Sequence, residues 1–224
     1  MISVIIPTYN EEKVIEKAIK SLLKEEGSLE IIIVDGASRD NTAALVANYP
    51  VKLISSEKNR GLQMNEGAKA AKGDIFLFLH ADCFLDKGSF EEIRNCIKEG
   101  FIGGCLKQRI TDSRAIYRWI ESSGNIRAKL SKIFYGDQAI FVRRDIFFKI
   151  GGFDEVALFD DVLFSKKLRR EGQTRVLNRN VYTLPRRWKR QGIIKVTLIN
   201  CIVNIGFKLG ISPQRLKKFY YDVR

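Results

Sequence analysis

Four acidic side chains stand where they could do chemistry. Asp35 and Asp82 each follow an apolar run of strand length, and Asp160 and Asp161 begin an amphipathic segment. Carboxylates in such places can accept hydrogen bonds from a ligand, hold a hard cation such as Mg²⁺ or Mn²⁺, or remove a proton from a hydroxyl group. Each of these positions also has a structural explanation, which has to be weighed beside the chemical one.

Asp35 is followed by Gly36, which permits a tight turn after the apolar run. The carboxylate at this place can accept a hydrogen bond from the N–H group of a nucleotide base or from a ribose hydroxyl. The structural alternative is that Asp35 only caps the next helix, a role that Ser38 or Asp40 could also fill. The position alone leaves both interpretations open.

His80 and Asp82 place an imidazole and a carboxylate two residues apart after the apolar run at residues 75–79. Alternate residues of a strand face the same way, so we expect both side chains on one side. The Asp82 oxygens suit Mg²⁺ or Mn²⁺, and such a metal would neutralise a diphosphate leaving group. His80 is the only histidine of the chain, and it is either a second metal ligand or a structural hydrogen-bonding group.

Asp160 and Asp161 begin a helical pattern that continues to Arg170. The positive end of a helix dipole stabilises negative charge, which is a sufficient structural reason for two acids. Successive helical residues point about 100° apart because a helix has about 3.6 residues per turn. Only one of the two acids can therefore face a common site, where it would act as a general base if it reached an acceptor hydroxyl.

The elements that must position these residues alternate regularly in the first half of the chain. This alternation predicts an α/β fold in which parallel strands are joined by right-handed crossovers and helices cover both faces of the sheet. Ligands bind beyond the carboxyl ends of such strands, where this chain has four polar segments. The predicted strands are residues 2–6, 29–34, 51–55 and 75–79, the predicted helices 14–23, 42–48 and 62–71, and the polar segments 7–12, 35–40, 57–61 and 80–82.

The second half of the chain is less regular. No linker separates it from the first half, so we expect one domain over residues 1–190 and an extension over residues 191–224. The predicted helices are residues 90–97, 115–130 and 160–170, and the predicted strands are residues 101–110, 138–142 and 174–177.

Six segments, in their order along the chain, carry a resemblance to a known family: residues 7–12 (PTYNEE), 34–42 (VDGASRDNT), 59–61 (NRG), 80–82 (HAD), 159–161 (FDD) and 168–170 (LRR). Together they resemble the family 2 nucleotide-sugar glycosyltransferases of GT-A fold, over roughly residues 1–190. The resemblance implies a Rossmann-like three-layer α/β/α fold with a mostly parallel central sheet. Residues 60–67, 135–138 and 186–188 are similar to a compact subgroup of small bacterial or archaeal members.

The resemblance also implies roles for individual residues. A nucleotide-diphosphate sugar donor would be bound, with its base and ribose held after the first two strands, and Asp82 would bind the metal as the family's D-x-D carboxylate. Asp161 would be the catalytic base, with Asp160 as the alternative, and the reaction would be a single inverting displacement by an acceptor hydroxyl. The remaining donor-site residues would be Pro7, Thr8, Tyr9, Glu11, Asp35, Arg60, Gln63, Ala81, Arg187 and Trp188.

Three positions depart from the family pattern. His80 stands in place of the first acid of D-x-D, so it takes that acid's place as the candidate metal ligand beside Asp82. Gly36 replaces the second acid that usually follows the strand, and Asp160 replaces a glutamate.

The tail from Arg186 to Arg224 is basic and apolar. It contains ten Lys or Arg residues against one acid, Asp222, and so carries +9 of the net charge of +13. Residues 193–209 form a predicted helix that is too short and too polar to span a membrane. This helix is either buried against the domain or lies in a membrane interface, with basic residues meeting anionic headgroups. The second alternative suits a lipid-like acceptor.

The cysteines and the N-terminus indicate the compartment. The four cysteines have no C-x-x-C spacing, which is typical of reduced thiols and does not favour a zinc site or a disulfide framework. The first residues lack a basic n-region and are read as a strand and not as a signal peptide. We therefore expect a cytoplasmic protein, free or peripheral on the inner face of the cell membrane.

Three other function classes share features with this sequence. A nucleotidyltransferase should show a glycine-rich, basic phosphate loop after the first strand, where this chain has residues 7–12. A nucleic-acid binder is suggested by the pI of about 9.7, but the excess charge lies in an apolar tail, so we expect no nucleic-acid partner. The third class is a protein that binds nucleotide sugars with lost or weak catalysis, because His80 alters the metal motif.

Overall fold

The β-branched runs of the first half form the parallel part of one sheet. The computed structural model describes residues 1–25 and 27–220, and in it β1 pairs in parallel with both β2 and β4, while β2 pairs with β3. The strands and helices of this half are β1 (Ile2–Thr8), α1 (Ile15–Leu22), β2 (Leu29–Asp35), α2 (Thr42–Val46), β3 (Lys52–Ser55), α3 (Arg60–Ala70) and β4 (Ile75–Phe78). The predicted βα alternation is confirmed.

The second half completes the sheet with mixed pairing. The strand order is β3-β2-β1-β4-β7-β6-β8-β5, and four of its seven pairings are parallel, as predicted for a mostly parallel sheet. The elements here are β5 (Cys83–Leu85), α4 (Ser89–Lys98), β6 (Gly103–Ile110), α5 (Ala115–Ser131), the 3₁₀ helix η1 (Gly136–Gln138), β7 (Ile140–Arg143), α6 (Arg144–Lys149), α7 (Asp160–Glu171) and β8 (Thr174–Thr183).

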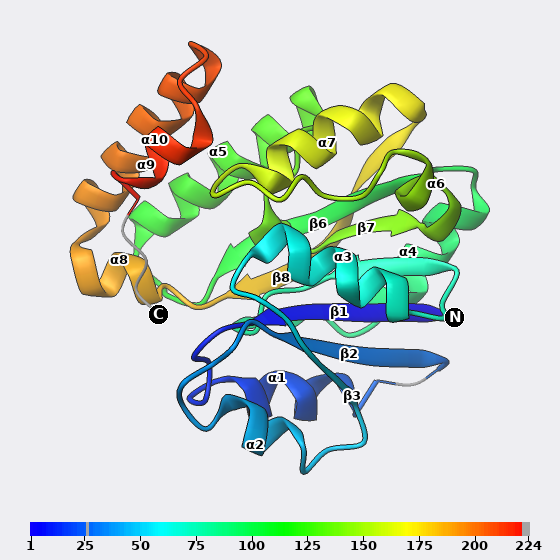
Figure 1. Ribbon diagram of the computed structural model, residues 1–224. Coiled ribbons are helices and arrows are strands. Elements are labelled where there is room, and N and C mark those ends of the chain that lie inside the picture. The colour runs from blue at the N-terminus through cyan, green and yellow to red at the C-terminus, as the bar shows by residue number, and fades with distance from the viewer. Residues whose placement is uncertain (26, 221–224) are drawn as a thin grey trace.

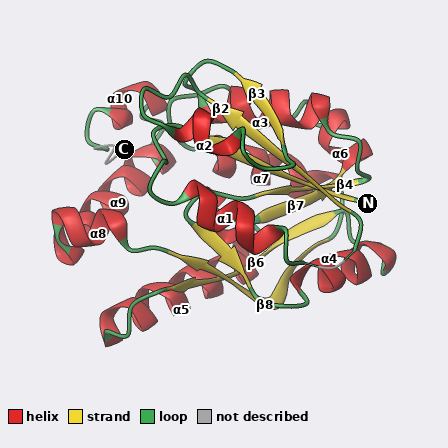
Figure 2. Ribbon diagram, turned by 90° about the horizontal axis from the view of Figure 1, so that it is seen from below, coloured by secondary structure: helices red, strands yellow, loops and turns green. Residues whose placement is uncertain are grey.

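Helices cover both faces of the sheet, which gives three layers (Figures 1 and 2). Alternate residues of β1 point to opposite faces: Ile2, Val4 and Ile6 belong to one buried cluster, and Ile5 belongs to the other. The first cluster also contains apolar residues of α1 and α4, and the second contains those of α3, α6 and α7. Burial on both faces explains why these strands read as continuous apolar runs.

Two strand predictions differ from the structure. β8 runs to Thr183, well past the predicted end at residue 177, because its second half pairs with both β6 and β5. β5 was not predicted, because it has only three residues. All four cysteines are free thiols.

The tail folds as three helices, α8 (Arg186–Gln191), α9 (Ile193–Lys208) and α10 (Pro213–Lys217). Val203 of α9 and Leu216 of α10 are buried with Phe159 and Val162, which flank the start of α7. The tail therefore packs on the body through one side of α9 and through Leu216 of α10. No helix within residues 1–25 and 27–220 is both long enough and apolar enough to cross a bilayer.

Candidate active site

Two loops at the carboxyl edge of the sheet are bonded to each other. The Asn10 N–H donates to Ser38 Oγ at 2.9 Å, and the Glu11 N–H donates to Thr42 Oγ1 at 2.8 Å. In return, Asn10 Oδ1 accepts from the Arg39 N–H at 2.9 Å. These bonds join the segment after β1 to the segment after β2. The neighbouring parallel strands thus bring the first two predicted motifs together.

Asp35 lies at the end of β2 with 6% of its surface exposed. Its carboxylate accepts from Thr8 Oγ1 at 3.2 Å, from the Ser38 N–H at 2.9 Å and from Ser38 Oγ at 2.5 Å. The first turn of α2 is capped by Asp40, whose Oδ1 accepts from the Thr42 N–H at 3.0 Å. Asp35 is therefore not the cap of α2, and its orientation is fixed by neutral donors.

Gln63 lies beneath this loop. Its Nε2 donates to the carbonyl oxygens of Thr8 and Val34, each at 2.8 Å, and so joins the ends of β1 and β2. A Cβ atom on Gly36 would stand 2.9 Å from the Gln63 amide, so a side chain at residue 36 would displace it. Gln63 is 4% exposed, and its amide holds together the two strand ends that carry the site.

His80 and Asp82 come together as predicted, although not by strand alternation. β4 ends at Phe78, and both residues lie in the connection between β4 and β5. One ligand atom each from His80, Asp82 and Cys83 lie within 4.8 Å of one another. Cys83 belongs to β5 and is 1% exposed, so the imidazole and the carboxylate are the two groups that can serve a ligand from the solvent side.

Arg186, in the first turn of α8, reaches this cluster. Its Nη1 and Nη2 donate to the two carboxylate oxygens of Glu11 at 2.6 and 3.1 Å. The same guanidinium contacts Asp82 Oδ2 through Nε at 3.0 Å and through Nη2 at 2.8 Å. Burial opposes the charge on Arg186, but the bonds from Glu11 and Asp82 outweigh it and raise the pKa of the guanidinium. One cation thus bridges two nearly buried carboxylates.

The two acids at the start of α7 have different surroundings. Asp160 accepts two hydrogen bonds from one edge of the Arg60 guanidinium, from Nε at 2.8 Å to Oδ2 and from Nη2 to Oδ1, and its side chain is 3% exposed. Asp161 accepts from the Gly136 N–H at 2.7 Å, lies 3.4 Å from Arg60 Nη2 and is 13% exposed. Burial raises the pKa of Asp161, Arg60 lowers it, and Asp160 raises it, with a net upward shift.

Gly136 connects this acid pair to His80. A Cβ atom on Gly136 would stand 2.7 Å from His80 Nε2 and 3.3 Å from Arg60 Nη1, so the bare backbone packs against the imidazole. A small hollow opens between these groups. Its lining brings together residues from five segments of the chain: Pro7, Arg60, Met64, Phe78, Leu79, His80, Gly136, Ile140, Phe153, Asp160 and Asp161.

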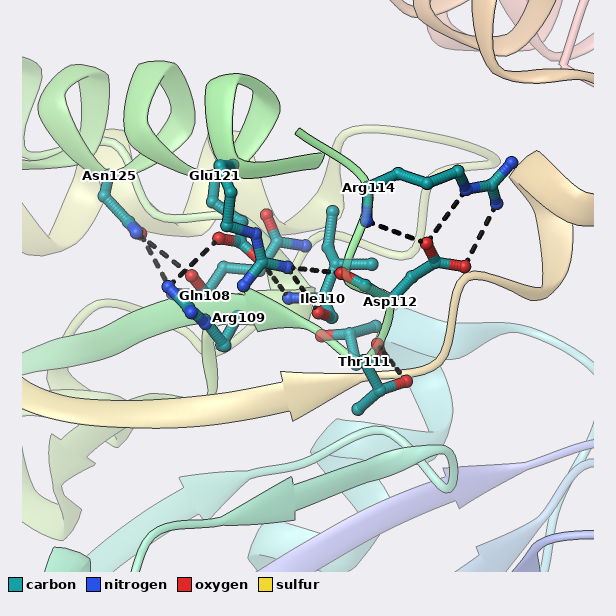
Figure 3. A network of polar contacts seen from close by, with 10 residues as sticks. Gln108, Arg109, Ile110, Thr111, Asp112, Arg114, Glu121 and Asn125 are labelled. Carbon is teal, nitrogen blue, oxygen red and sulfur yellow. Dashed lines mark hydrogen bonds and ion pairs between the residues drawn. The ribbon is translucent and has the colours of Figure 1, made fainter. Parts of the chain in front are cut away.

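Asp137 is a further acid at this place that the sequence interpretation did not select. Burial and the nearby Asp161 raise the pKa of Asp137 to about 6, against the lowering effect of Arg127. Its Oδ2 accepts from Gln108 Nε2 at 2.5 Å, while its Oδ1 is buried and has no hydrogen-bond donor among residues 1–25 and 27–220. Gln108 is held in turn by its backbone bonds with the Asn125 side chain, at 2.9 and 3.0 Å (Figure 3).

A buried glutamate fixes α5 over the end of β6. Glu121 is 3% exposed, accepts from the Ile110 N–H and forms an ion pair with Arg118 at 2.7 Å. Figure 3 shows this network beside Gln108 and Asn125. The helix that carries Asn125 is thereby anchored, which holds Gln108 in reach of Asp137.

The contacts of Arg187 and Trp188 lie away from the acids of the site: Arg187 contacts the tail and Trp188 contacts α5. Arg187 Nη1 donates to Asn200 of α9 at 3.2 Å, and its guanidinium lies 3.7 Å from the ring centroid of Tyr220. Trp188 packs edge-on against Tyr117 of α5, with ring centroids 5.8 Å apart. In this basic run Arg186 reaches the site, although the sequence pattern indicated Arg187 and Trp188 as the donor-site residues.

Comparisons with known proteins identify the family of this chain. Residues 3–154 match the family described as Glycosyl transferase family 2. An uncharacterized glycosyltransferase of Haemophilus influenzae is 30% identical over 76% of this chain and 63% of its own length. A GalNAc(5)-diNAcBac-PP-undecaprenol beta-1,3-glucosyltransferase of Campylobacter jejuni is 30% identical over 58% of this chain and 42% of its own length. The chain thus spans only part of these relatives.

Solved structures give the same fold. TarS of S. aureus in complex with UDP-GlcNAc has a TM-score of 0.67 at 23% identity, over 82% of this chain and 58% of that one. The mannosyltransferase PcManGT from Pyrobaculum calidifontis, in complex with GDP-Man and Mn²⁺, has a TM-score of 0.70 at 20% identity, over 97% of this chain and 67% of that one. The predicted GT-A fold is confirmed, and since the family match covers most of the chain, this protein belongs to glycosyl transferase family 2.

Proposed function

We propose that this protein transfers a sugar from a nucleotide-diphosphate donor to a hydroxyl acceptor, with inversion at the sugar carbon. One observation carries the proposal: a series of neighbouring groups links the donor-side carboxylates to the acid pair of α7. Arg186 joins Glu11 to Asp82, Asp82 lies beside His80, and His80 packs on Gly136, which donates to Asp161. A leaving diphosphate and an attacking hydroxyl therefore have charged groups on the same rim.

Asp161 suits the role of general base better than Asp160. Asp160 is nearly fully buried and is neutralised by two bonds from Arg60. Asp161 is the more exposed of the two and lines the hollow, and its raised pKa makes it a stronger base than an ordinary aspartate. In the proposed reaction, Asp161 removes the acceptor proton while the acceptor oxygen attacks the sugar carbon from the face opposite the diphosphate.

The residues around Asp82 fit a divalent cation. Asp82 supplies a carboxylate oxygen and His80 a nitrogen within 4.8 Å, and the Arg186 guanidinium already occupies a place where positive charge is stabilised by two carboxylates. Mg²⁺ or Mn²⁺ held there would neutralise the charge that develops on the leaving diphosphate. A solved neighbour, PcManGT, binds GDP-Man with Mn²⁺, which supports this choice of metal.

The remaining donor contacts follow from the arrangement of the rim. We assign the nucleotide to the loops of Pro7, Thr8, Tyr9 and Glu11 and to Asp35, whose carboxylate is held ready by Thr8 and Ser38. Arg60 lines the hollow and orients the acid pair. Arg187 and Trp188 act through the packing of α8 on α9 and α5. The Campylobacter relative is described by an undecaprenol-linked substrate, which supports a lipid-linked hydroxyl as the acceptor class.

A thermal-shift screen of nucleotide sugars, with and without Mn²⁺, tests the proposal. Binding to the native state raises stability by RT ln(1 + [L]/Kd), which is about 2.7 kcal/mol at a hundredfold excess over Kd. We expect one nucleotide class to raise the Tm, more strongly with Mn²⁺, and Asp82→Asn to remove the metal-dependent part. Lys98→Gln, on the far helix α4, is the matched control. The proposal fails if no nucleotide sugar changes the Tm; binding without transfer would instead support the alternative of a donor-binding protein.

A further inference from the structure

Helix α9 is apolar on two opposite sides, and only one of them is covered. Val196 and Val203 face the body and are buried, and Phe207 stacks on Phe159 with ring centroids 4.2 Å apart. Five large aliphatic side chains on the other side are between 56% and 78% exposed, at spacings of three to four residues: Ile194, Leu198, Ile202, Ile205 and Leu209. We call these five residues the outer stripe.

An apolar stripe of this length is unusual on the surface of a soluble monomer, where larger exposed patches mark interaction sites. The outer stripe runs the whole length of a helix of 16 residues. Shared spacings of three and four residues place its members on one helix face, away from Val196 and Val203. Since α9 keeps its own packed side, the stripe is available to a partner without unfolding the tail.

The surroundings of the stripe are cationic. Lys195 and Lys208 lie on α9 itself and are exposed, and Arg215 and Lys218 are exposed in the segment that follows. Residues 186–220 contain no acidic side chain. An isologous contact between two copies through this face would bring like charges together. A partner with an apolar interior and a negatively charged surface avoids that repulsion.

We infer that the outer stripe docks on an anionic lipid membrane, with α9 lying in the plane of the interface. A helix with an apolar face and flanking Lys or Arg residues inserts that face between the headgroups, and anionic lipids add attraction. The inference rests on the proposed function and extends it. It identifies the membrane surface from which a lipid-linked acceptor would reach the site. The inner face of α9 packs on Phe159, the residue directly before the acid pair, so the docked helix would lie next to the proposed base.

The test is flotation of the full chain with vesicles of phosphatidylcholine, with or without phosphatidylglycerol, at low and at high salt. We expect binding to the anionic vesicles at low salt and much less binding to pure phosphatidylcholine. The double variant Leu198→Glu with Ile202→Glu should bind at least tenfold more weakly. Lys195→Gln and Lys208→Gln should each weaken binding to the anionic vesicles by about fivefold.

Leu23→Glu is the matched control, since Leu23 is a 43% exposed leucine at the end of α1, and it should float like the wild type. Every variant is also checked for donor-induced thermal shift, which docking variants should keep; this separates a failure of docking from a failure of the proposed function. The inference is wrong if the wild type does not float at low salt or if the double glutamate variant floats as well as the wild type. It is equally wrong if sedimentation shows a wild-type dimer that the double variant dissociates.

Discussion

The two sides of the candidate site are held by different forces. On the nucleotide side, the loops after β1 and β2 are joined by hydrogen bonds from neutral donors, among them Ser38 to Asp35 at 2.5 Å. On the other side, the carboxylates are held by the guanidinium groups of Arg60 and Arg186, which lie about a hundred residues away along the chain. A hydrogen bond from a neutral donor to a carboxylate contributes about 1.5–3 kcal/mol, whereas removing one partner of a buried ion pair costs about 3–5 kcal/mol. Substitutions should therefore be more disruptive on the second side.

The largest effect is expected for Asp161→Asn, which removes the proposed base but keeps the shape of the side chain. The rate of transfer should fall by about a thousandfold, within the usual range for loss of a general base, while donor binding is retained. Because the pKa of Asp161 is raised, the wild-type rate should decline on the acid side at a higher pH than an ordinary aspartate would give. Steady-state rates across pH provide the measurement; unchanged transfer in the variant would remove this assignment.

Asp160→Asn should act on stability first. It leaves the Arg60 guanidinium without the carboxylate that now accepts two of its hydrogen bonds, and breaking such a buried pair costs about 3 kcal/mol. Urea unfolding measures the loss. The assignment of Asp160 to stability would be contradicted if Asp160→Asn were as stable as the wild type and Asp161→Asn were the less stable variant.

Arg186→Gln tests whether the guanidinium stands where the metal would bind. Without it, Glu11 and Asp82 lose their shared cation, so the variant should be less stable in EDTA but should bind Mn²⁺ about tenfold more tightly, equivalent to about 1.4 kcal/mol. Titration of Mn²⁺ followed by Tm measures both effects. Arg187→Gln, at the adjacent position that contacts Asn200, is the control, and an equal response in the two variants would contradict the assignment.

Ser38→Ala should give the smallest change. It removes the hydroxyl that donates to Asp35 and accepts from the Asn10 N–H, at a cost of about 1.5 kcal/mol. Urea unfolding and donor thermal shift together give the result. A loss as large as that of Asp160→Asn would mean that the neutral side is held as tightly as the charged side.

The two sides of the site also differ in how much of them could be predicted from the sequence. The strands of the first half are continuous apolar runs, and the parallel order that follows from them places Asp35 at the correct edge without further information. The meeting of His80 and Asp82 was predicted, but the turn that brings them together was not, because β4 ends at Phe78. The local sequence pattern was sufficient to predict a contact where the residues that lie close in space also belong to one βα unit.

The contacts that depend on distant pairing could not be predicted in this way. Arg186 lies in a basic run beside Arg187 and Trp188, and nothing in that run shows which residue turns inward. Asp137 lies in the short η1 segment, and its buried position depends on Gln108 of β6 and on α5. The length of β8 was underestimated for the same reason, since its pairing with β5 and β6 lies outside the local pattern.

Arg186 also limits how the C-terminal helices can be exchanged. Glu11 is 1% exposed and Asp82 is 8% exposed, and α8 contributes the cation that pairs with both carboxylates. A chain cut after Pro185 would therefore retain every strand of the sheet but lose this counter-ion. A tail grafted from another protein would have to deliver a cation to that spot, whatever surface its other helices were meant to recognise. A division of the chain that keeps this contact must therefore come after Arg186.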